Sequence, residues 1–244
     1  VDSADYKKVL GTEKIEQNKK EIAIIGAGPA GLSAAHYLSV MGYQITVYES
    51  KEKAGGMMRY GIPEYRLPYD ALDKDINYIK SLGVEFVFNT KVGEDITMDE
   101  LHDKYEAVFA ATGLHNGRST SVPGTENNNV YQAVDLLADI ARGKEVPTTE
   151  KIVVIGGGNV AMDIARSMAR IQKQKYGEVN VTVTSLENED IMPADEEEIE
   201  EAREEGVVFE PGRGPKEIEL NEDGSIAQLC TNCCVSVFDE EMNF

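Results

Sequence analysis

The spacing of apolar residues along the chain predicts two copies of a strand–helix–strand unit. In each copy a short apolar run is followed by apolar residues at helical spacing and then by an alternating, β-branched stretch. These elements are expected at residues 21–25, 29–41 and 44–48, and again at 151–155, 161–175 and 179–185. Strands joined through a helix pair in parallel. The pattern therefore predicts an α/β protein with two parallel sheets.

Further elements are predicted around these two units. Strands are expected at 84–89, 106–111 and 207–210 and, as a hairpin, at 218–220 and 226–237; helices are expected at 69–82, 133–142 and 193–205. Glycine- and proline-rich residues 51–68 and the stretch 120–129 are expected to be loops. The composition turns polar near 143–150, which we interpret as a domain boundary. The expected organisation is an N-terminal helix or arm (1–20), a first domain (21–145) and a second domain (146–244).

A glycine-rich loop opens the helix of the first unit. It has the spacing Gly-x-Gly-x-x-Gly and consists of Gly26, Ala27, Gly28, Pro29, Ala30 and Gly31. Gly26 permits a tight turn, Gly28 lets the backbone approach a pyrophosphate, and Gly31 lets the helix pack closely on the strand. The helix N-terminus adds unpaired N–H groups and a partial positive charge. Glu49, at the end of the second strand, can accept hydrogen bonds from both ribose hydroxyls and would repel a 2′-phosphate. The loop therefore predicts a dinucleotide site.

The second unit carries a variant of the same loop with alanine at the third position. Its residues are Gly156, Gly157, Gly158, Asn159, Val160 and Ala161. Asn159 and Val160 are expected to present backbone N–H groups to a second pyrophosphate. Aligning the two units places Ser185 where Glu49 lies, with Glu187 two residues later. Neither is the arginine that a 2′-phosphate requires. The sequence therefore favours NAD over NADP, unless Arg203 or Arg213 folds back.

The charge of the chain limits its partners. Its net charge of −20 argues against nucleic acid, which is bound by basic patches. Acidic residues concentrate between 187 and 205; we interpret them as a solvated helix face, with a docking face for a basic partner as the alternative. No run of about 18 apolar residues occurs, and residues 1–20 lack a signal-peptide core. We expect a cytoplasmic enzyme with no membrane span.

The three cysteines, Cys230, Cys233 and Cys234, lie close together. An odd, clustered set is not a disulfide framework, and a four-coordinate metal would need a ligand from elsewhere. Because the segment alternates like a strand, we expect buried or free thiols and no metal. No hydrolytic motif occurs, and hydride transfer from a nicotinamide to a flavin needs no protein acid or base. We therefore assign no catalytic residue.

Three segments resemble the small (beta) subunit of bacterial glutamate synthase and related NAD(P)H:FAD oxidoreductases: Ala54–Pro68, Val154–Asp163 and Met192–Glu200. Those relatives include the flavin part of dihydropyrimidine dehydrogenase and the large subunit of NADH-dependent ferredoxin:NADP oxidoreductase. The resemblance covers residues 21–244. It implies two Rossmann-like domains, an FAD domain with an inserted NAD(P) domain. Electrons would pass from NAD(P)H through FAD to a partner subunit or an iron–sulfur acceptor.

The resemblance also implies particular cofactor contacts. FAD is expected to contact residues 27–31, Glu49, Gly56, Met57, Arg66, Val92, Thr112 and Gly113, and the nicotinamide dinucleotide residues 158–161. The guanidinium group of Arg66 suits a phosphate oxygen.

The chain departs from the family pattern in three ways. The family usually places a cysteine-rich cluster domain before the FAD domain, whereas residues 1–20 contain no cysteine. Leu186 and Glu187 stand where many members carry two arginines. The C-terminal segment that completes the FAD domain is missing, so we expect a truncated chain. The alternative reading is a non-catalytic dinucleotide-binding or electron-relay module of a larger complex. A flavin disulfide reductase is disfavoured because the cysteines fall in the distal strands of the second unit.

Overall fold

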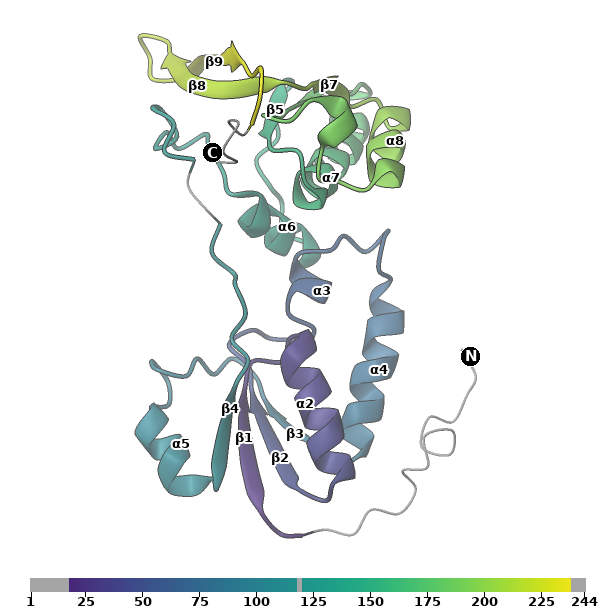
Figure 1. Ribbon diagram of the computed structural model, residues 1–244, viewed down its shortest axis with the longest axis vertical. Coiled ribbons are helices and arrows are strands. Elements are labelled where there is room, and N and C mark those ends of the chain that lie inside the picture. Colours follow the sequence, from purple (N-terminus) through teal and green to yellow (C-terminus); the bar gives the residue numbers. More distant parts are fainter. Residues whose placement is uncertain (1–17, 118–119, 238–244) are drawn as a thin grey trace. The chain divides into compact units, whose positions relative to one another are not determined.

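The computed structural model describes residues 18–117 and 120–237, which fall into two compact units (Figure 1). One unit ends at His115 and the other begins at Asn116. The arm or helix expected at 1–20 lies almost entirely outside the described residues. Helix α6 (Ala133–Ala141) belongs to the second unit, because its Leu137 is part of that unit's core. The assignment of the cofactor domains to 21–145 and 146–244 stays a prediction.

The first unit is built on a four-stranded parallel sheet. Its strands are β1 (Glu21–Ile25), β2 (Gln44–Tyr48), β3 (Glu85–Val87) and β4 (Ala107–Ala110), in the spatial order β3-β2-β1-β4. This is the strand order of a Rossmann half. Ile22 and Ile24 on β1 face one layer of the core, and Ala23 and Ile25 face the other. Because helices cover both faces of the sheet, side chains on both sides of β1 are buried, and successive residues of the strand are apolar.

Helices cover both faces of this sheet (Figure 1). Helices α2 (Pro29–Val40) and α4 (Tyr69–Ser81) pack on one face, and α5 (Met98–Lys104) packs on the other. Leu72, Ile76 and Ile79 are buried, as the pattern predicts. Helix α5 was not predicted: it has seven residues and one buried side chain, Leu101, too few for a periodicity. A capping box, Thr97 with Glu100, marks its start.

The second unit repeats the arrangement with three parallel strands. They are β5 (Ile152–Ile155), β6 (Val181–Thr184) and β7 (Val208–Glu210), in the order β5-β6-β7. Helices α6, α7 (Asn159–Tyr176) and α8 (Glu196–Glu204) share one core with this sheet. A hairpin of β8 (Arg213–Leu220) and β9 (Ile226–Cys233) follows.

Several element boundaries differ from the sequence prediction. The expected loop 51–68 contains one helical turn, α3 (Met57–Tyr60), and β9 ends at Cys233 instead of 237. Helix α8 begins at Glu196, three residues after the predicted start, and a 3-10 turn, η1 (Glu189–Ile191), precedes it. Buried Met192 and Ala194 hold the intervening chain in the core in a non-helical path. None of the described helices is long and apolar enough to cross a membrane.

Candidate dinucleotide-binding sites

The first glycine loop connects β1 to α2, and two of its glycines are required by packing. Gly26 has a φ of +99°, and a methyl group there would overlap the carbonyl oxygen of Ala111. A methyl group on Gly31 would overlap the carbonyl oxygen of Gly26. At Gly28 the nearest atom to an added Cβ is the Gly56 Cα, 3.8 Å away, which is an ordinary contact. The protein itself therefore does not need a glycine at 28, and the space there is available to a ligand.

Glu49 is buried and bound to the loop. Its carboxylate accepts hydrogen bonds from the backbone N–H groups of Ala27, at 2.8 Å, and Lys51, at 2.9 Å. Only 6% of the residue is exposed. The Ala27 N–H therefore donates to Glu49, and the role of Ala27 as an FAD contact stays a prediction. The Ser50 Oγ also donates to this carboxylate, at 3.2 Å. A carboxylate has about four acceptor positions, so Glu49 retains capacity for about one ribose hydroxyl.

A second segment, residues 54–56, crosses the first glycine loop. The Gly55 N–H donates to the Ala27 carbonyl at 2.8 Å. Gly56 has a φ of +53°, and a Cβ on it would lie 2.6 Å from the Gly28 Cα. The buried side chain of Arg59 holds this segment, a role that no motif in the sequence predicts. Arg59 donates to the Ala54 carbonyl at 2.7 Å and forms an ion pair with Asp73 on α4.

The remaining predicted FAD contacts lie on loops of the same unit. Thr112 and Gly113 are exposed directly after β4, at the carboxyl edge of the parallel sheet where Rossmann folds bind nucleotides. Arg66 is half-buried in the turn between α3 and α4, and Met57 opens α3. Val92 forms an isolated bridge with Ile96 and packs on the core. Their roles as cofactor contacts stay predictions.

Lys51 and His115 lie beside Glu49 and were not expected at the site. The Lys51 Nζ is 3.4 Å from the His115 Nδ1. Burial and the charge of Lys51 lower the pKa of His115, and the nearby Glu49 only partly offsets this. The surroundings of His115 therefore disfavour its charged form.

The second glycine loop connects β5 to α7 in the same way as the first connects β1 to α2. The Gly156 N–H donates to the Thr184 carbonyl at 2.8 Å, as the Gly26 N–H donates to the Tyr48 carbonyl at 2.8 Å. Ile155 is opposite Thr184, and Ile25 is opposite Tyr48. Ser185 thus takes the place of Glu49, which confirms the alignment made from the sequence.

The end of β6 determines what lies beside this loop. The Ser185 Oγ donates to the Glu187 carbonyl at 2.9 Å, and a Cβ on Gly157 would lie 2.9 Å from the Glu187 Oε2. The carboxylate of Glu187 therefore turns back toward the glycine loop. A cavity of about 460 Å³ opens next to it, lined by Leu186, Glu187, Asn188, Ile191, Pro193 and residues 234–237.

Arg203 and Arg213 are the two arginines that the sequence offers as partners of a 2′-phosphate. Arg203 is engaged elsewhere: it pairs with Glu189 at 2.6 Å and lies over the ring of Phe209. Arg213 adjoins the end of β6, because its N–H donates to the Ser185 carbonyl at 2.7 Å. Its half-exposed guanidinium group is 3.7 Å from Glu210.

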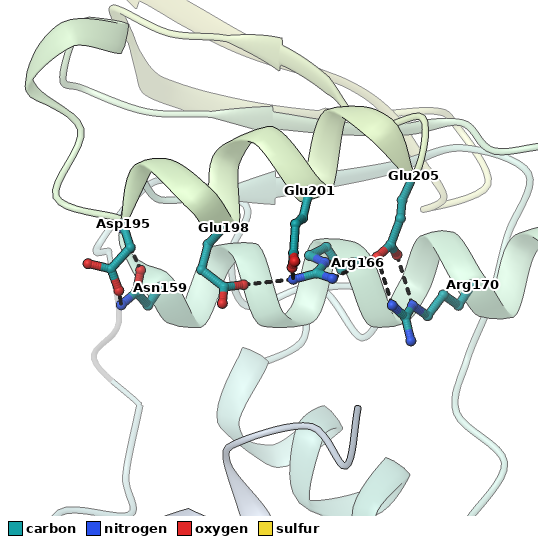
Figure 2. Close-up of polar contacts among 7 residues, drawn as sticks. All are labelled: Asn159, Arg166, Arg170, Asp195, Glu198, Glu201 and Glu205. Carbon is teal, nitrogen blue, oxygen red and sulfur yellow. Dashed lines mark hydrogen bonds and ion pairs between the residues drawn. The ribbon is translucent and has the colours of Figure 1, made fainter. Parts of the chain in front are cut away.

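Residues 192–195 form a strap across the second glycine loop. The Ala194 N–H donates to the Gly157 carbonyl at 3.0 Å. The side chain of Asn159, the first residue of α7, accepts from the Asp195 N–H and donates to the Asp195 carboxylate, both at 2.8 Å (Figure 2). The neighbouring Val160 is exposed at the start of the helix. The sequence contains the strap as Met-Pro-Ala-Asp, but nothing in its spacing pairs it with residue 159.

Contrary to the sequence prediction, the acidic residues between 187 and 205 do not all face solvent. Arg166 on α7 pairs with Glu198 and Glu205 at 2.8 Å and with Glu201 at 2.5 Å, and Arg170 pairs with Glu205 at 2.8 Å (Figure 2). Arg166 and Glu198 are buried, with 4% and 8% of each residue exposed. One face of α8 is therefore an internal ion-pair surface, and the expectation of a solvated face is wrong for it.

The cysteines are free thiols, and none of the three is buried. Possible ligand atoms of Glu217, Glu219 and Cys230 lie within 4.8 Å of one another on the β8–β9 hairpin. A hydrogen bond to Glu219 raises the pKa of Cys230.

The family of this chain is identified by comparison with known protein families. The sequence model of the pyridine nucleotide-disulphide oxidoreductase family matches residues 20–236. The chain belongs to this family. The fold agrees, since FprA from Mycobacterium tuberculosis, solved in complex with NADPH, superposes with a TM-score of 0.70 at 18% identity, covering 90% of this chain and 68% of FprA. The prediction of two Rossmann-like units is confirmed.

Two relatives within the family are similar over most of the chain. The NADP(+)-dependent formate dehydrogenase subunit beta of Moorella thermoacetica is 45% identical over 78% of this chain and 27% of the relative. The glutamate synthase [NADPH] small chain of Escherichia coli is 32% identical over 87% of this chain and 46% of the relative. The resemblance to the glutamate synthase small subunit is confirmed. The chain spans less than half the length of either relative, and both names specify NADP, so the expected preference for NAD gains no support.

Proposed function

We propose that this oxidoreductase binds FAD at the first glycine loop and NAD(P)H at the second, and passes electrons from NAD(P)H through FAD to a partner subunit or an iron–sulfur acceptor. The observation that carries the proposal is the difference between two loops of the same construction. The first ends beside a buried carboxylate, Glu49, and the second beside a hydroxyl, Ser185. A carboxylate suits the unmodified ribose of FAD, whereas Ser185 does not exclude a 2′-phosphate.

The residues of the first unit fit FAD. Gly28 leaves its outer side open, and the N-terminus of α2 directs N–H groups and a partial positive charge toward a pyrophosphate. Glu49 is held by two backbone N–H groups and can hold the ribose. Bound FAD supplies the hydride and electron-transfer chemistry. The residues named here bind and orient it.

At the second loop, Gly158 to Ala161 would hold the pyrophosphate of the nicotinamide dinucleotide. No atom lies within 4 Å of a Cβ added to Gly158, so the approach to its backbone is open. The cavity beside Glu187 lies after the second strand of the unit, where Rossmann folds bind the adenosine ribose. The relatives that are beta subunits and small chains support a partner subunit as the electron acceptor.

The proposal is tested by adding FAD to the purified protein and then NADH or NADPH without oxygen. We expect the absorbance of the bound flavin to bleach with either nucleotide. Reoxidation by an added iron–sulfur ferredoxin would support the proposed acceptor. A protein that stays colourless after FAD addition would instead support the alternative reading, a non-catalytic dinucleotide-binding module.

The preference between the two nucleotides is expected to depend on Glu187 and Arg213. Glu187→Arg should raise the kcat/KM ratio of NADPH to NADH by about tenfold, because it replaces a repelling carboxylate by a phosphate ligand. Arg213→Ala should lower the same ratio, since residue 213 adjoins Ser185. Steady-state kinetics with both nucleotides measure the effect. Unchanged ratios in both variants would contradict this assignment.

A further inference from the structure

In both units a neighbouring segment holds the glycine loop by the same backbone contact. The carbonyl of the second loop residue accepts an N–H from that segment: Ala27 from Gly55 in the first unit, and Gly157 from Ala194 in the second. In the second unit a reciprocal side-chain pair, Asn159 and Asp195, also joins the loop to this segment. The additional pair therefore belongs to the site proposed for the pyridine nucleotide.

The side chain of Asp195 pairs with Asn159 instead of capping its own helix, α8. It is the N-cap residue of α8, the position where an aspartate side chain ordinarily accepts from the backbone of its own helix. No such capping bond forms here, and the carboxylate accepts instead from Asn159 on α7. The strap itself is fixed, because Met192 and Ala194 are buried in the core. The pair consequently attaches the first turn of α7 to a rigid part of the unit.

We propose that Asp195 is a positioning residue for the pyridine nucleotide, and this rests on the proposed function of the second loop. By holding the side chain of Asn159, it keeps the N-terminal turn of α7 in the conformation that presents backbone N–H groups to the pyrophosphate. Because the Asn159 amide is committed to Asp195, the nucleotide is bound by the main chain of this turn. The carboxylate acts as a hydrogen-bond acceptor, and its charge is not required.

Two substitutions separate the hydrogen bond from the charge. Asp195→Ala removes the acceptor, whereas Asp195→Asn keeps an oxygen at that position and removes the charge. We expect Asp195→Ala to raise the Kd and KM for the preferred nucleotide about tenfold, with kcat at saturating nucleotide and FAD content unchanged. Asp195→Asn should stay within about twofold of the wild type. Glu200→Ala, at an exposed position of α8, is the matched control.

A measurement without nucleotide makes the outcome independent of the proposed function. Hydrogen exchange of residues 156–161 should be faster in Asp195→Ala than in the wild type, and Asp195→Asn should restore the protection. Asn159→Ala should resemble Asp195→Ala, and the double variant should be no worse than either. If the wild type binds neither nucleotide, the proposed function fails while the exchange still tests the contact. Wild-type binding and exchange in Asp195→Ala, or equal losses in both Asp195 variants, would overturn the proposal.

Discussion

Gly31→Ala is expected to lower the free energy of unfolding of the first unit by about 3 kcal/mol, the upper range for overpacking in a well-packed region. The added methyl group would overlap the carbonyl oxygen of Gly26, which is a backbone atom and cannot turn away. Helix α2 would have to move off β1, and the loop between them would lose its shape. Loss of bound FAD should accompany the loss of stability.

Gly28→Ala is the matched control for this prediction. At Gly28 φ is −80°, which alanine adopts readily, and the added Cβ would make only an ordinary contact. We expect the free energy of unfolding to stay unchanged while the Kd for FAD rises about tenfold, because the methyl group occupies the approach to the pyrophosphate. Urea unfolding and FAD titration of both variants measure the two effects. Equal stability of the two variants would contradict the packing role of Gly31.

Arg166→Ala is expected to lower the free energy of unfolding of the second unit by about 3–5 kcal/mol, the cost of leaving a buried charge uncompensated. Arg166 and Glu198 are both buried, and Arg166 also pairs with Glu201 and Glu205 (Figure 2). Arg170→Ala removes a partner whose side chain is 46% exposed and should cost less than about 1 kcal/mol. Urea unfolding compares the variants, and similar losses in both would contradict the importance of burial.

The same ion-pair network predicts a dependence of stability on pH. Burial alone would raise the pKa of Glu205, but its hydrogen bonds and ion pairs with Arg170 and Arg166 outweigh burial and lower the pKa below the ordinary value of 4.5. A carboxylate with a lowered pKa stabilises the folded state above its unfolded pKa. That contribution is lost as the pH falls through the folded value. The second unit should therefore lose stability below about pH 4.5, and Arg166→Ala should reduce this dependence.

The sequence predicted those parts of the fold that are determined by local pattern. Apolar runs located the strands, and the glycine spacing located both loops and the equivalence of Ser185 with Glu49. Helix α5 was not predicted because a single buried leucine gives no periodic pattern. The start of α8 was predicted too early because burial of Ala194 in the core overrides helix propensity. The ion pairs of Arg166 join residues more than 30 positions apart. No spacing rule relates such residues, so the acidic face was expected to be solvated.

The approach of Gly56 to Gly28 has a consequence for how related sequences diverge. A side chain at 56 would meet the Cα of residue 28, an atom that every amino acid possesses. Any side chain at position 56 is therefore excluded, whichever residue occupies position 28. At position 28 it is mainly the bound ligand that excludes a side chain. In a lineage that loses the cofactor but keeps the fold, we expect residue 28 to drift and residue 56 to remain glycine. The two positions together would then distinguish descendants that still bind from those that only fold.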